Sequence, residues 1–83
     1  MMSVEQLRNS QVKNSVVVHV DELLDEQRRQ NIESIVEQVG GVTSAHFNTT
    51  RHHLMVVDYD TGRTNSGEIL TRVKRQHLHA QLI

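Results

Sequence analysis

The order of the apolar patterns along this 83-residue chain constrains its fold more than any other feature. Four runs of β-branched or alternating apolar residues are typical of strands, and they span 15–20, 42–47, 54–59 and 80–83. Two further segments have apolar residues at helical spacing, one after Asp25 and one after Asn65. The chain therefore predicts strands and helices in the order β-α-β-β-α-β.

Both predicted helices carry signals at their ends. Asp25 and Asn65 are suitable N-caps, and Glu68 completes a capping box three residues after Asn65. Gly40-Gly41 predicts the end of the first helix, because glycine accepts the left-handed conformation that follows a last turn. The expected buried stripe of the first helix is Ile32, Ile35, Val36 and Val39. The expected buried stripe of the second helix is Ile69, Leu70, Val73 and His77.

Two split β-α-β halves of this length pack as one four-stranded antiparallel sheet with both helices on one face. This is the α+β, ferredoxin-like βαββαβ sandwich, in which we expect the strand order 4-1-3-2. Residues 1–14 have only scattered apolar side chains among turn-forming ones, so we predict a flexible N-terminal tail there. The domain itself is predicted to span residues 15–83.

The composition excludes several classes of function. The chain has no cysteine, which rules out disulfides, thiolate metal sites and thiol chemistry within it. A formal net charge of -1 argues against general nucleic-acid binding. No apolar run approaches the roughly 18 residues of a membrane helix, and none resembles a signal peptide, so we expect a cytoplasmic protein without membrane insertion. No spacing places a base beside a nucleophile, and no glycine loop could hold a phosphate, so we expect neither enzymatic activity nor a cofactor.

Several short segments and two core positions between about Val16 and Leu82 have a characteristic joint spacing. They are Ile32-Glu33, Gly41-Val42, Val57-Asp58-Tyr59-Asp60, Ile69, Val73 and His77-Leu78-His79-Ala80. In this spacing the chain resembles the heavy-metal-associated (HMA) domains of copper chaperones and P-type ATPases. The resemblance implies the ferredoxin-like fold reached above from the patterns.

The functional motif of that family, Met-x-Cys-x-x-Cys after the first strand, is not preserved. Leu23 stands at the methionine position, Asp25 at the first cysteine and Arg28 at the second. Copper(I) prefers thiolates, and a carboxylate beside a guanidinium does not replace them. None of the family's metal ligands therefore carries over to this chain.

Six histidines are the most unusual feature of the composition. Imidazole binds zinc, nickel and copper(II), so one hypothesis is a metal-binding protein that uses histidine and carboxylate ligands. Its candidate ligands are His19, His46, His77 and His79. No pair has the spacing of a helical metal site, and adjacent His52 and His53 would point to opposite faces of a strand. The competing interpretation is ordinary surface or interface histidines.

Strand alternation predicts an apolar strip on the sheet face away from the helices. Val17, Leu54 and Val56 form this strip, with His19 and His46 on either side. A contiguous apolar patch indicates a docking or self-association surface, whereas single exposed apolar residues are common on any protein. We interpret these five residues as an interface, either for a protein partner or for a second copy in a homodimer.

Two charged groups are open to a functional reading. The acidic group could hold a hard cation and the basic group could contact phosphates, but both are expected at solvated helix ends, where they match the helix dipole. Their members are Asp21, Glu22, Asp25 and Glu26, and Arg63, Arg72, Lys74 and Arg75. The leading hypothesis is a non-catalytic HMA-like domain that has lost its thiolate site and binds protein. The alternatives are histidine-based metal binding and a small-ligand regulatory domain.

Overall fold

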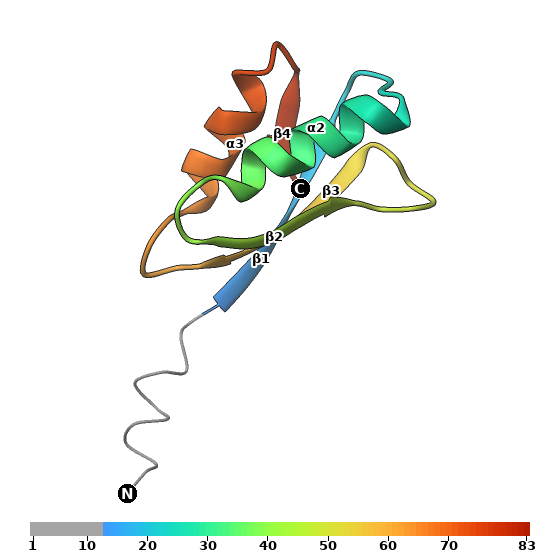
Figure 1. The fold of residues 1–83 in the computed structure, drawn as a ribbon. Helices are drawn as coiled ribbons and strands as arrows, with labels where there is room; N and C mark the ends of the chain where they lie inside the picture. The colour runs from blue at the N-terminus through green and yellow to red at the C-terminus, as the bar shows by residue number, and fades with distance from the viewer. Residues whose placement is uncertain (1–12) are drawn as a thin grey trace, which may run out of the picture.

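The computed structural model describes residues 13–83, which form six elements (Figure 1). In chain order they are β1 (Lys13–Val20), α2 (Glu26–Glu37), β2 (Val42–Phe47), β3 (Leu54–Asp60), α3 (Ser66–Lys74) and β4 (Ala80–Leu82). The predicted β-α-β-β-α-β order is confirmed. Strand β1 begins two residues before the predicted strand, because Lys13 and Asn14 pair with Asp60 and Tyr59 of β3. The rest of the predicted tail, residues 1–12, lies outside the described residues.

The four strands form one antiparallel sheet in the order β2-β3-β1-β4, which confirms the predicted ferredoxin-like topology. Both helices cover the same face of this sheet (Figure 1). Strands β1 and β3 are central, and their register pairs Val17 with Val56 and His19 with Leu54. Strand β2 is one edge of the sheet, and the three-residue β4 is the other.

The core lies between the sheet and the two helices. Its fully buried members alternate along β1 and β3 and recur at helical spacing on α2 and α3. The largest of them are Ile32, Met55, Ile69, Val18, Val20, Val36, Val57 and Val73. No buried side-chain nitrogen or oxygen within residues 13–83 lacks a hydrogen-bond partner.

One predicted core residue of α2 is not buried. Ile32 and Val36 are fully buried and Val39 nearly so, but Ile35 is only half-buried. Each residue turns a helix by about 100°, so position 35 lies about 60° away from Ile32, on the side away from Val36. Ile35 therefore lies at the margin of the buried stripe, and the prediction that it belongs to the core was wrong.

The helix starts agree with the sequence, and the ends differ in detail. The Asp25 side chain accepts from the backbone N–H of Arg28, and the Asn65 side chain accepts from that of Glu68. The carboxylate of Glu68 accepts from the Thr64 hydroxyl instead of completing a capping box. Helix α2 ends at Glu37, before the two glycines.

Gly41 is needed in the turn that leads into β2. Its φ is +100°, and a Cβ there would lie 2.8 Å from the Cβ of Arg63. His77 was predicted on the buried stripe of the second helix, and this was wrong. It lies beyond the end of α3 with a φ of 64° and is exposed, while Leu78 is buried instead.

Candidate interaction surface and loop end

The structure brings the five predicted interface residues together on one sheet face. His46 of β2, Val56 of β3 and Val17 of β1 form one row across the sheet, and Leu54 and His19 lie in the next row. Val17, His19, Leu54 and Val56 are half-buried, whereas His46 is exposed. Within residues 13–83 both helices lie on the opposite face, so no other element covers this strip.

Ile83 extends the apolar strip and was not predicted as part of it. Its backbone N–H donates to the carbonyl of Val17 at 3.0 Å, which places Ile83 beside Val17 on the β4 side. The Ile83 side chain is 76% exposed. Predicting that Ile83 lies in the strip would have required the register of the last strand. This register is set by the pairing of β4 with β1, which the local sequence pattern does not show.

A polar group borders the strip further along β3. The carboxylate of Asp58 accepts from the hydroxyls of Ser15 on β1 and Ser44 on β2. These hydrogen bonds, the one from Ser15 first, lower the pKa of Asp58 below its ordinary value. The uncovered face therefore has an apolar centre with a polar boundary at this side, where Lys13 lies near the Asp58 carboxylate.

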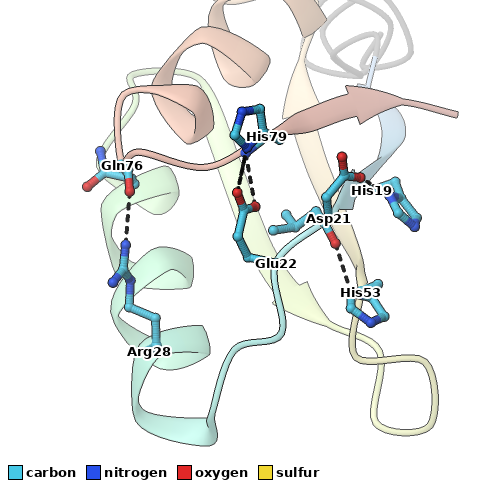
Figure 2. A network of polar contacts seen from close by, with 8 residues as sticks. His19, Asp21, Glu22, Arg28, His53, Gln76 and His79 are labelled. Atoms are coloured by element: carbon cyan, nitrogen blue, oxygen red, sulfur yellow. Dashed lines mark hydrogen bonds and ion pairs between the residues drawn. The ribbon is translucent and has the colours of Figure 1, made fainter.

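The positions of the family's thiolates have structural roles here. Asp25 caps α2, and Arg28 donates through Nη2 to the carbonyl of Gln76 at 2.9 Å, which ties α2 to the connection after α3 (Figure 2). Leu23, at the methionine position, is 87% exposed. This loop has neither a soft ligand nor a free pair of ligands for copper(I).

A second tie joins the same two loops. Glu22, between β1 and α2, accepts from the backbone N–H of His79 at 2.9 Å and contacts its Nδ1 at 2.7 Å (Figure 2). The hydrogen bond between the two side chains raises the pKa of His79 above its ordinary value and lowers the pKa of Glu22. The two residues are 57 positions apart, so this pair was not foreseeable from local patterns.

His19 and His53 form a further cluster at the end of β1. The Nδ1 atom of His19 lies 3.1 Å from the Asp21 carboxylate, and the His19 and His53 rings stack with centroids 5.8 Å apart. The Nδ1 atom of His53 lies 2.9 Å from the carbonyl of Val20 (Figure 2). This arrangement joins the β2–β3 hairpin to the end of β1.

The four candidate metal ligands do not converge in one place. Strand β3 separates His19 from His46, while His79 is bonded to Glu22 and His77 follows α3. Among the described residues, no group of three or more histidine, aspartate or glutamate side chains is arranged to hold a metal ion. The acidic group is likewise divided between the cap of α2 and the pairs with His19 and His79.

Comparisons with known proteins find similarity in structure only. No protein-family model matches the chain, and no curated protein matches its sequence. A copper-binding domain from HMA7, a P-type ATPase, is 16% identical, with a TM-score of 0.75 over 83% of this chain and 92% of that chain. Oxidized MerP from Ralstonia metallidurans CH34 is 13% identical, with a TM-score of 0.76 over 86% and 97%.

The copper chaperone of Enterococcus hirae in its apo form is 19% identical, with a TM-score of 0.74 over 82% of this chain and 98% of that chain. These neighbours confirm the HMA-like, ferredoxin-like fold that the resemblance predicts. The absence of cysteine fits a variant of that fold without the thiolate pair. None of the helices between residues 13 and 83 is both long and apolar enough to cross a bilayer.

Proposed function

We propose that this chain is a non-catalytic HMA-like domain that has lost its copper site and associates with a second copy of itself through the uncovered sheet face. The observation that carries the proposal is the strip of Val17, Leu54 and Val56, on the central strands of a face that no described element covers. Ile83 widens the strip toward β4. Burial of such a strip provides a hydrophobic driving force of about 25 cal/mol per Å² before the costs of association.

A second copy suits this face because an apolar strip is complementary to itself. A two-fold axis brings the same patch of both copies together, and uncharged aliphatic side chains in its centre meet without a desolvation penalty for charge. His19 and His46 lie on either side of the strip and would border the interface between the two copies.

The loss of the copper site supports an interaction role over metal transfer. Asp25 and Arg28 are engaged in capping α2 and in holding the carbonyl of Gln76. In the copper-binding HMA7 domain and the Enterococcus hirae chaperone the same fold handles copper. Here the fold would contribute its surface only.

Sedimentation velocity at pH 8 tests the proposal. The wild type should show a dimer whose population rises with concentration, and Val56→Lys should remain monomeric, because an ammonium group would be buried in the strip. Ser34→Lys, exposed on α2 on the other side of the molecule, is the control with the same added charge and should dimerise like the wild type. A monomeric wild type, or a Val56→Lys protein that still dimerises, would overturn the proposal.

A further inference from the structure

Two glutamates of α2 bind the outer edge of the sheet. The backbone N–H of Phe47 donates to the Glu33 carboxylate at 2.6 Å, and that of Ala45 donates to the Glu37 carboxylate at 3.2 Å. Both amides belong to β2, which is an edge strand. Edge strands usually expose such donors, and another chain can pair with them.

The register shows that these amides point away from the sheet. Directly after β2, the backbone N–H of Asn48 donates to the carbonyl of Leu54, which begins β3. Backbone N–H groups of an antiparallel strand alternate in direction, so beyond the bulge between Val42 and Ser44 those of Ser44 and His46 also point toward β3, and those of Ala45 and Phe47 point outward. Ala45 and Phe47 are therefore the donors that an added strand would use. In place of a strand, both donate to carboxylates from the neighbouring helix.

The spacing of the two elements explains how one helix serves both donors. Residues four apart on a helix are separated by about 6 Å along its axis, and residues two apart on a strand by about 6.6 Å. Glu33 and Glu37 therefore present their carboxylates at nearly the interval of Phe47 and Ala45. Glu33 is half-buried and bonds at the shorter distance, so it forms the more enclosed contact.

We infer that the β2 edge is a latent strand-docking surface that Glu33 and Glu37 hold closed, and that without them it pairs with β2 of a second copy. A second copy is the partner that fits, because two identical edge strands pair antiparallel about a two-fold axis and extend the two sheets into one. The carboxylates occupy the donors that this ladder requires. Strand pairing at the β2 edge is distinct from the association through the sheet face proposed above. By blocking this pairing, Glu33 and Glu37 would leave the sheet face as the surface through which two copies associate.

The test uses the Val56→Lys background, so that association through the sheet face does not contribute. In it, Glu33→Ala with Glu37→Ala removes both acceptors, and Glu33→Gln with Glu37→Gln removes the same charge but keeps an acceptor oxygen at each position. Sedimentation velocity measures association, and amide hydrogen exchange measures the Ala45 and Phe47 donors. The parent variant should be monomeric with both amides protected.

The alanine pair should associate with rising concentration, while the glutamine pair should not. In dilute solution, the Ala45 and Phe47 amides of the alanine pair should exchange at least about tenfold faster than in the parent, and become protected again as the protein associates. A folded alanine pair that stays monomeric at high concentration, or a glutamine pair that associates equally well, would overturn the inference.

A single Glu37→Ala variant covers the case in which the alanine pair does not fold, because it leaves the Glu33 contact in place. In this single variant, only the Ala45 amide should become exposed. Its association should be weaker than that expected for the variant with both Glu33→Ala and Glu37→Ala. An Ala45 amide that stays as protected as in the parent would equally overturn the inference. Because every variant already carries Val56→Lys, the outcome does not depend on whether the wild type dimerises through its sheet face.

Discussion

The burial of α2 can be tested with two isoleucines on the same helix. Ile32 has no exposed surface and lies in the core, whereas Ile35 is half-buried at its margin. Replacing isoleucine by alanine removes three carbon atoms, each worth about 0.8 kcal/mol when fully buried. For Ile32 this gives about 2.4 kcal/mol, and the cavity left behind raises the expected loss to about 3–4 kcal/mol.

For Ile35→Ala about half of the transfer energy applies and no closed cavity forms, so the expected loss is about 1 kcal/mol. A domain of this size is stable by only about 4–10 kcal/mol, so the larger loss is a substantial share of the total. Urea denaturation of both variants, with unchanged m-values, measures the difference. Equal losses, or a loss below about 1 kcal/mol for Ile32→Ala, would refute the packing described for α2.

Three further predictions follow from the loops. His77→Gly should leave the free energy of unfolding at or above that of the wild type, whereas His77→Val should lower it by about 1–2 kcal/mol, because of the positive φ; equal urea midpoints would contradict this. The Glu22 hydrogen bond raises the pKa of His79. The contribution of protonated His79 to the stability of the fold is therefore complete below the ordinary pKa of 6.5, and it is lost as the pH rises through the folded-state pKa. The lowered pKa of Glu22 makes the contribution of this residue present above 4.5 and lost as the pH falls through the folded-state value. An NMR titration should show the His79 pKa falling toward its ordinary value in Glu22→Gln, and no change would contradict the pair. With Asp25 and Arg28 at the thiolate positions, the chain should release copper(I) to a competing chelator, and a stoichiometric complex that survives would be inconsistent with a lost site.

Much of the fold was predictable from local patterns. The β-branched run at Val16 to Val18 and the caps at Asp25 and Asn65 are local signals, and the structure agrees with them. Lys13 and Asn14 carry no strand pattern, and they join β1 only because β3 offers partners. The error at Ile35 arose because residue spacing alone does not give the angular width of the buried stripe of α2. The error at His77 arose because spacing alone does not show where α3 ends.

The candidate surface was predictable because it depends on alternation and strand order. The predicted strand order makes β1 and β3 neighbours, and side-chain alternation puts Val17 and Val56 on the same face. Both the strand order and the alternation can be inferred from the sequence. The contacts of Glu33 with Phe47 and of Glu22 with His79 were not predictable. These contacts depend on how a helix packs beside a strand and on how two loops distant in sequence meet. Neither produces a periodic residue pattern that can be recognised in the sequence.

The claim that the uncovered sheet face binds a second copy is tested most directly by isotope-filtered NMR. A sample that mixes isotope-labelled and unlabelled chains reports only contacts between copies. If two copies associate through this face, we expect intermolecular NOEs among the methyl groups of Val17, Leu54 and Val56. The absence of any intermolecular NOE at high concentration, or NOEs confined to the methyl groups of α2 and α3, would contradict it.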